Sequence, residues 1–211
     1  IGYITDLLDL RCCDNMELMS QYEDNHFDLA IVDPPYELPK RSGQVAGKLA
    51  NRKIQEMHQL GWDIAPKKEY FDELFRVSKN QIIWGGNYFG DYLGRTRGIL
   101  CWDKQQPFEN FSAWEMAWTS FDCVAKIYRY PTTAVRGKIH PTQKPVGLYQ
   151  YILKNYAKKD DKILDTHLGS GAIAIATQEE GMHLTGCEIS KEYFNQIVKR
   201  VKDNPIQATF A

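Results

Sequence analysis

Short apolar runs and segments with helical spacing alternate along most of the chain. The runs suit strands that are buried on both faces of a sheet, and they lie at residues 29–32, 81–84, 162–164 and 183–187. Apolar residues spaced three or four positions apart predict helices around residues 70–75, 148–156, 172–178 and 194–201. This alternation is typical of an α/β fold with a mostly parallel sheet.

Polar residues indicate where further elements begin and end. Residues 4–13 read as a strand, and Asp14 is a good N-cap for a helix that continues to about Tyr22. Ser190 is a similar cap for the last helix. Three further apolar runs, at residues 99–102, 114–118 and 123–130, follow one another closely, which favours antiparallel pairing at one edge of the sheet.

The run Leu29–Val32 leads directly into Asp33-Pro34-Pro35-Tyr36. Proline cannot continue a strand, so Asp33 should project at the carboxyl edge of the sheet, where open parallel sheets bind ligands. The Asp33 carboxylate and the Pro34 carbonyl are acceptors, which together can take both hydrogens of a nucleobase amino group while Tyr36 stacks on the base. We therefore expect a catalytic site here, the alternative being an acidic strand end followed by an ordinary turn.

A second group of residues suggests a cofactor site. The strand Lys162–Asp165 ends in an acid and precedes the turn Gly169-Ser170-Gly171, whose glycines let the backbone approach a ligand. The next strand ends at Glu188, 23 positions after Asp165, and an acid near that offset suits a ribose diol. The pattern favours an adenosine cofactor over a tight turn with a surface acid. NAD is disfavoured because the third glycine of the dinucleotide fingerprint is missing.

The turn at residues 140–145, His-Pro-Thr-Gln-Lys-Pro, precedes the helix predicted around residues 148–156. Lys144 and the first free N–H groups of that helix can form an anion site that fits a carboxylate. The alternative is an ordinary helix-entry turn.

Composition limits the partners of the chain. Its 211 residues suit one α/β domain, and 26 Lys and Arg against 27 Asp and Glu give a formal net charge of −1, which attracts neither nucleic acid nor an acidic membrane as a whole. Five cysteines without a C-x-x-C pair and five scattered histidines predict no metal site. The odd cysteine count, with no signal peptide or long apolar segment, favours a cytoplasmic location and no membrane association.

Any contact with DNA must therefore come from a local patch. Residues 37–58 have little apolar content and read as a mobile basic loop or a frayed helix. Within residues 40–53 there is no acid, and the five basic residues that we expect to contact DNA phosphates are Lys40, Arg41, Lys48, Arg52 and Lys53. The alternative is a solvated loop that is kept polar for solubility.

Taken together, these motifs resemble the amino-directed DNA methyltransferases that use S-adenosylmethionine. Residues 33–36 are similar to their catalytic motif, residues 140–145 to the turn that holds the methionine moiety, and residues 165–171 to their glycine-rich cofactor loop. The catalytic motif precedes the cofactor loop, which is the circularly permuted order of the beta group. The resemblance implies a Rossmann-like methyltransferase fold: a mostly parallel seven-stranded sheet with helices on both faces and one antiparallel strand.

The resemblance also implies roles for single residues. Asp165 would bind the methionine amino group, Glu188 the ribose hydroxyls, and Asp14 would lie near the cofactor adenine. The expected cofactor-binding residues are Asp14, His140, Thr142, Gln143, Lys144, Asp165, His167, Gly169, Ser170, Gly171 and Glu188. The implied activity is direct methyl transfer to N6 of adenine in double-stranded DNA after base flipping, without a metal, because Asp33 at the first motif position favours adenine in this family.

Two departures from the family pattern keep alternatives open. Thr166-His167 stands where the family usually has Pro-Phe, and residues 103–139 are short for a target-recognition segment. The short segment fits an enzyme with a relaxed DNA recognition sequence, or one that acts as a homodimer or with a partner subunit. The resemblance further implies a restriction-modification enzyme that is bacterial or phage-encoded. The alternative activities are cytosine-N4 methylation of DNA, methylation of RNA or of a small-molecule amine, and a catalytically silent subunit that only binds cofactor or DNA.

Overall fold

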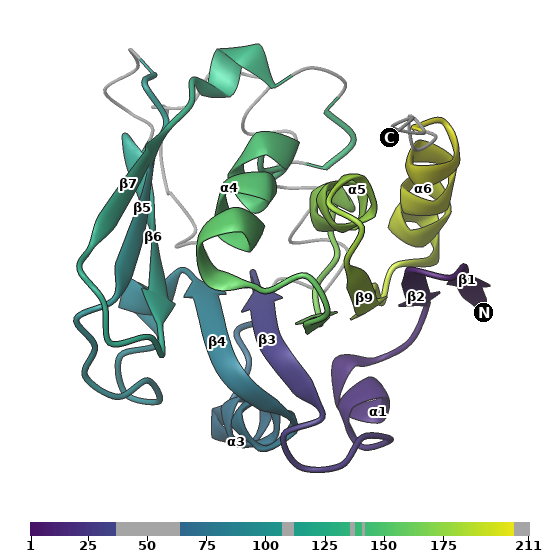
Figure 1. Ribbon diagram of the computed structural model, residues 1–211, viewed down its shortest axis with the longest axis horizontal. Coiled ribbons are helices and arrows are strands. Elements are labelled where there is room, and N and C mark those ends of the chain that lie inside the picture. The colour runs from purple at the N-terminus through teal and green to yellow at the C-terminus, as the bar shows by residue number, and fades with distance from the viewer. Residues whose placement is uncertain (37–63, 107–111, 136–137, 141, 205–211) are drawn as a thin grey trace.

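One mixed sheet organises the computed structural model, which describes residues 1–36, 64–106, 112–135, 138–140 and 142–204 (Figure 1). Within these residues the sheet has nine strands in the spatial order β1-β2-β9-β8-β3-β4-β6-β5-β7. Their bounds in chain order are β1 Gly2–Ile4, β2 Leu8–Arg11, β3 Phe27–Val32, β4 Ser78–Trp84, β5 Ile99–Asp103, β6 Trp114–Thr119, β7 Lys126–Arg129, β8 Lys162–Asp165 and β9 His183–Cys187.

The strand pairing confirms the predicted fold class, but the strands at the two edges of the sheet differ from the prediction. β2, β9, β8, β3 and β4 are parallel, and β6 is antiparallel to both β4 and β5. These seven strands form the expected sheet with one antiparallel strand, and a short strand is added at each edge. β7 follows β6 in the chain and runs opposite to it, but both sides of β6 are occupied, by β4 and β5. β7 therefore pairs with the outer side of β5, to which it is parallel, and the prediction of antiparallel pairing was wrong for this strand.

The N-terminal strand expected at residues 4–13 is divided into two strands. Thr5 accepts a hydrogen bond from the Leu8 N–H at 3.0 Å through its hydroxyl and donates its own N–H to the Leu8 carbonyl at 2.8 Å. This tight turn reverses the chain, so β1 pairs antiparallel with β2. The alternation of apolar residues continues through the turn, which is why a single strand was expected.

Helices cover both faces of the sheet (Figure 1). Their bounds are α1 Asn15–Met19, α3 Lys68–Val77, α4 Val146–Tyr156, α5 Ala172–Glu179 and α6 Lys191–Lys202, with short 3-10 helices η1 Gly86–Tyr88 and η2 Thr132–Ala134. The predicted caps are confirmed: the Asp14 carboxylate accepts the Met16 N–H at 2.8 Å, and the Ser190 hydroxyl accepts the Tyr193 N–H at 3.3 Å.

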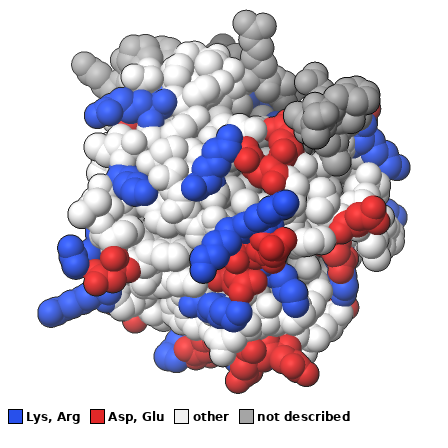
Figure 2. Space-filling view, viewed as in Figure 1, with Lys and Arg blue, Asp and Glu red and all other residues white. Residues whose placement is uncertain are grey.

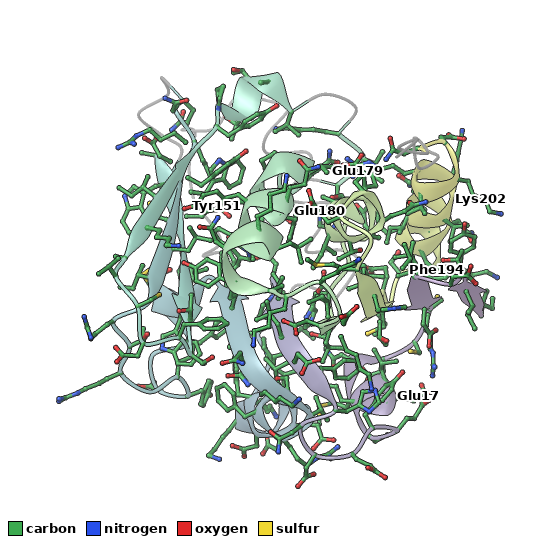
Figure 3. The ribbon with its side chains drawn as sticks, viewed as in Figure 1. Glu17, Tyr151, Glu179, Glu180, Phe194 and Lys202 are labelled. Atoms are coloured by element: carbon green, nitrogen blue, oxygen red, sulfur yellow. The ribbon has the colours of Figure 1, made fainter. Side chains whose placement is uncertain are left out.

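The core consists of one apolar cluster on each face. α4, α5 and α6 pack on one face, where the predicted inward residues Phe194, Ile197 and Val201 are buried, and Phe194 points from α6 into the core (Figure 3). α1 and α3 contribute to the cluster on the other face, together with Phe27. A sheet that is covered on both faces leaves its strand edges as the places where polar groups can converge.

Charged side chains on the outer surface form local pairs. Lys154 of α4 lies 3.0 Å from Glu180, which follows α5, and Gln150 donates to the neighbouring Glu179 at 2.8 Å; both acids are labelled in Figure 3. Figure 2 shows Lys and Arg interspersed with Asp and Glu over the same face, in agreement with the balanced composition. In the described ranges no helix is both long and apolar enough to cross a membrane.

The direction of the strands brings distant parts of the chain to one edge. β3, β4, β8 and β9 are parallel, so Asp33, Gly85, Thr166 and Glu188 all follow strands at the same edge of the sheet. β6 runs the opposite way, which brings its first residues to that edge as well. The basic segment at residues 37–58 lies outside the described residues, and so do the five basic residues expected to contact DNA.

Candidate active site

A cavity of about 490 Å³ lies at this carboxyl edge. Its volume falls in the usual range for ligand sites. Predicted site residues that line it are Asp14, Asp33, Pro34, Pro35, Tyr36, His140, Thr142, Gln143, Lys144, His167, Gly169, Ser170 and Glu188. These residues are far apart in the sequence, and the sheet brings them together around one cavity.

Two of the predicted residues do not line the cavity. Asp165 is buried at the end of β8, and its Oδ1 accepts the His167 N–H at 2.9 Å. Gly171 has a positive φ of 69°, and a Cβ there would lie 2.7 Å from Ile197. The packing of α6 against the start of α5 therefore explains this glycine, in place of the close approach to a cofactor that we had expected.

Asp33 has one paired and one unpaired oxygen. Its Oδ2 lies 2.5 Å from Nζ of Lys144, whereas Oδ1 is buried and has no hydrogen-bond partner among the described residues. Burial raises the pKa of Asp33 above its ordinary value, although Lys144 opposes that shift. Buried polar atoms are nearly always hydrogen-bonded, so an unpaired carboxylate oxygen beside a cavity indicates a ligand with a hydrogen-bond donor.

Lys144 does not have the surroundings that we predicted for a carboxylate-binding residue. Its side chain is only 2% exposed and its Nζ contacts Asp33 at 2.5 Å and Glu115 at 3.1 Å, with the Trp84 ring centroid 5.0 Å away. Burial lowers the pKa of Lys144, but Asp33 and Glu115 outweigh burial and hold that pKa well above its usual value. Its ammonium is already paired with two carboxylates, so it is not free for a cofactor carboxylate.

Tyr36 is held by a second tyrosine. Its ring stacks on Tyr88 of η1 with centroids 4.4 Å apart and an interplanar angle of 3°. The stack requires Gly85, which has a φ of 70° and where a Cβ would lie 2.9 Å from the Tyr36 ring. Because Tyr88 covers one face of the Tyr36 ring, a base can stack only on the opposite face.

The two acids of the predicted cofactor site are held by backbone N–H groups. Glu188 accepts from Gly169 N at 3.0 Å through Oε2 and from Ser190 N at 2.9 Å through Oε1. Burial raises the pKa of Glu188 above its ordinary value, and it raises the pKa of Asp165 to about 8. These carboxyl groups therefore take up protons easily unless a partner that favours their charged form binds beside them.

Thr166 and His167 belong to a buried polar network that the sequence did not predict. The Thr166 hydroxyl lies 2.7 Å from the Tyr70 hydroxyl and 2.9 Å from Nδ1 of His167, and Nε2 of His167 lies 3.1 Å from the side-chain amide of Asn15. Burial lowers the pKa of His167 to about 4, so its ring is neutral at pH 7. Tyr70 had been identified only as an apolar helix position.

The turn at residues 140–144 adds a second unpaired group. Gln143 accepts the Ile139 N–H at 3.0 Å through Oε1, while its buried Nε2 has no hydrogen-bond partner in the described part of the chain. The Thr142 hydroxyl lies 3.0 Å from Nδ1 of His140, whose pKa burial lowers to about 4. The cavity thus has a buried N–H donor at Gln143 and a buried acceptor at Asp33.

Within the described ranges, no three His, Cys, Asp or Glu side chains are grouped so that they could hold a metal ion.

Glu115, which pairs with Lys144, is the main site residue that sequence reasoning missed. A signal was present, because Glu115 alternates in phase with the buried residues Ala117 and Thr119 of β6, and an acid on the buried side of a strand requires a partner.

The chain is similar in sequence to known DNA methyltransferases. A family model with the description DNA methylase, for N6 and N4 methyltransferases, matches residues 102–199. The type II methyltransferase M2.MboI of Moraxella bovis is 26% identical over 234 residues, covering 88% of this chain and 84% of that protein. The type II methyltransferase M.HpaI of Haemophilus parainfluenzae is 24% identical, covering 91% of this chain and 73% of that protein.

Solved structures share the fold. The M1.HpyAVI–SAM complex has a TM-score of 0.63 at 18% identity, covering 92% of this chain and 99% of that chain. PvuII DNA methyltransferase, described as cytosine-N4-specific, has a TM-score of 0.68 at 14% identity, covering 97% and 90% of the two chains. Together, the family model, the relatives and the shared fold support an S-adenosylmethionine-dependent DNA amino-methyltransferase of the N6-adenine/N4-cytosine family.

Proposed function

We propose that this DNA methyltransferase transfers a methyl group to the exocyclic N6 of adenine in double-stranded DNA. The observation that carries the proposal is the buried Oδ1 of Asp33, which has no hydrogen-bond partner among the described residues and lies beside a cavity that Pro34 and Tyr36 also line. An amino group of a base has two N–H donors, and a pocket of acceptors is complementary to it.

The residues at the ends of β8 and β9 suit the cofactor of the family. S-adenosylmethionine supplies a methyl group that is already activated on a sulfonium when it is bound. The Asp165 carboxylate is proposed to hold the amino group of its methionine moiety, and Glu188, fixed by two backbone N–H groups, its ribose hydroxyls. The buried Nε2 of Gln143 is an unpaired donor that fits a carboxylate, which is the role we had first assigned to Lys144.

Asp33 and Pro34 act on the base. By accepting the two amino hydrogens, the Asp33 carboxylate and the Pro34 carbonyl orient the nitrogen lone pair out of the plane of the ring and towards the methyl donor. Tyr36, fixed by Tyr88, offers one ring face for stacking, which is worth about 1–3 kcal/mol per base and offsets much of the cost of base flipping. The amino nitrogen would form its bond to the methyl group as the bond from that methyl to the sulfonium sulfur breaks, which leaves S-adenosylhomocysteine, and the nitrogen would then lose one proton to solvent. No covalent enzyme intermediate is required.

One comparison favours a second target. PvuII DNA methyltransferase, which is described as cytosine-N4-specific, shares the fold over 97% of this chain. Cytosine N4 is also a planar exocyclic amine, so Asp33 and Pro34 can accept its hydrogens in the same way. Adenine remains the proposal because the motif at residues 33–36 begins with Asp33.

Identification of the methylated nucleoside tests the proposal. The protein is incubated with S-adenosylmethionine labelled in the methyl group and with plasmid DNA from a methylation-deficient host or with RNA, and the nucleic acid is then digested to nucleosides. We expect label in N6-methyldeoxyadenosine and none in RNA. Label in N4-methyldeoxycytidine would support the second target, whereas label in RNA alone, or no transfer at all, would contradict a DNA methyltransferase.

A further inference from the structure

Four charged side chains of alternating sign lie in series along the carboxyl edge of the sheet. Asp33 contacts Lys144 at 2.5 Å, Lys144 contacts Glu115 at 3.1 Å, and Glu115 contacts Lys104 at 2.5 Å. Side-chain exposure is 17% for Asp33, 2% for Lys144, 21% for Glu115 and 16% for Lys104. Interactions between charges that are this well shielded from water are much stronger than those of surface pairs.

The sheet topology explains this arrangement. Asp33 follows β3, Glu115 lies at the start of the antiparallel β6, and Lys104 follows β5, so all three reach the same edge from strands in the spatial order β3-β4-β6-β5. Lys144 spans the intervening strand β4 by packing over Trp84 at its end, 5.0 Å from the ring centroid. Lys104 lies over Trp102 in a similar way, at 5.5 Å.

We propose that Glu115 is a positioning residue for the reaction: it holds the Lys144 ammonium between two carboxylates, so that Lys144 occupies one oxygen of Asp33 and leaves the other to the amino group of the base. This inference rests on the proposed function of Asp33. It assigns Glu115 no contact with base or cofactor.

The donor geometry of lysine supports this role. An ammonium group has three N–H donors. Asp33 and Glu115 each take one in the structure, and the Trp84 ring covers a further direction. Without the Glu115 carboxylate, Lys144 would have a free N–H within reach of the second oxygen of Asp33, which is the oxygen that the base requires.

Glu115 and Lys104 should shift the pKa of Asp33 in opposite directions. The negative charge of Glu115 raises the pKa of Asp33, whereas the positive charge of Lys104 lowers it. The charged or titratable groups that act on Asp33 or are acted on by it are Lys144, Glu115, Lys104, Asp165, Tyr36, Tyr70 and Tyr149. The pKa values of the three tyrosines are raised above their usual value of 10.0, so these rings stay neutral between pH 5 and 9.

The test compares Glu115→Gln with Lys104→Met, and Glu115→Asp serves as the conservative rescue. The rate of methyl transfer from saturating labelled S-adenosylmethionine to plasmid DNA is measured between pH 5 and 9. The carboxyl signal of Asp33 is titrated by NMR in the free protein, with Asp33→Asn to assign it. Calorimetry with S-adenosylhomocysteine checks that the cofactor pocket of each variant is intact.

We expect Glu115→Gln to lower the transfer rate about 10- to 100-fold, in the range seen when a supporting residue is removed from a site. It should move the Asp33 titration and the acidic limb of the rate profile to lower pH by about half a unit to one unit, and Lys104→Met should move both to higher pH. Glu115→Asp, which keeps the charge, should recover most of the rate and the wild-type midpoint.

Midpoints that stay in place, or that move in the same direction in both variants, would overturn the proposal, and so would a Glu115→Gln rate within about threefold of wild type. If Glu115→Gln does not fold, Glu115→Met, which is similar in size and also uncharged, takes its place, with the same expected loss of rate and downward shift and the same outcomes against the proposal. Wild-type protein that methylates no DNA would contradict the proposed function itself, and the NMR titration would still report whether Glu115 acts on Asp33.

Discussion

Among single residues, Asp165 shows how burial and function are related. Its pKa of about 8, raised mainly by burial, means that the free protein holds a proton on this carboxyl group at pH 7. The proton leaves as the pH rises through about 8. In the proposed role of Asp165, the ammonium of the cofactor binds the ionised carboxylate, so we expect cofactor binding and loss of this proton to favour each other.

We therefore predict that the affinity for S-adenosylhomocysteine increases between pH 6 and 8, by up to about tenfold per pH unit. Asp165→Asn should remove this pH dependence and weaken binding by about 1.5–3 kcal/mol at pH 8, the value of one charge-assisted hydrogen bond. Calorimetry across this range measures both effects. Asp72→Asn, which changes an exposed acid of α3, is the control. Equal affinity and equal pH dependence in Asp165→Asn and wild type would refute the assigned role of Asp165.

Among the elements, the basic segment after the catalytic motif is the part of the chain proposed to contact DNA. It contains Lys40, Arg41, Lys48, Arg52 and Lys53 without an acid between residues 40 and 53. The segment directly follows the catalytic motif in the sequence, and we expect its basic residues to contact the phosphates that flank a flipped base. DNA binding that depends on such contacts weakens with salt because each contact releases counterions.

Replacement of Arg41, Arg52 and Lys53 together by alanine should flatten the slope of log affinity against log salt by about two to three units, since each phosphate contact contributes about 0.9. Duplex binding measured by fluorescence anisotropy over a salt series gives the slope. The matched control replaces Lys79, Arg97 and Lys159, which lie at the start of β4 or precede β5 and β8, at the opposite edge of the sheet. A wild-type slope in the first triple variant would exclude this segment as the DNA contact.

At the scale of the whole molecule, the sequence predicted what local patterns encode. Apolar runs located the strands, Asp14 and Ser190 located helix starts, and the prolines that end the strand before Asp33 predicted a candidate site at the carboxyl edge of the sheet. Pairings between distant strands are not encoded locally, so the parallel partner of β7 was missed. For the same reason the pairing of Lys144 with Asp33 and Glu115 was not foreseen, because it depends on β6 running against its neighbours.

In the proposed mechanism, Asp33 binds the amino group of the target base and not the cofactor. Asp33→Ala tests it most directly, because Lys144 keeps Glu115 as a partner and the fold is expected to persist. We predict a loss of methyl transfer of at least about 100-fold, as expected for removal of a group that acts on the reacting amine, with an unchanged affinity for S-adenosylhomocysteine. A folded Asp33→Ala protein that transfers methyl groups at near the wild-type rate would show that Asp33 does not act on the base.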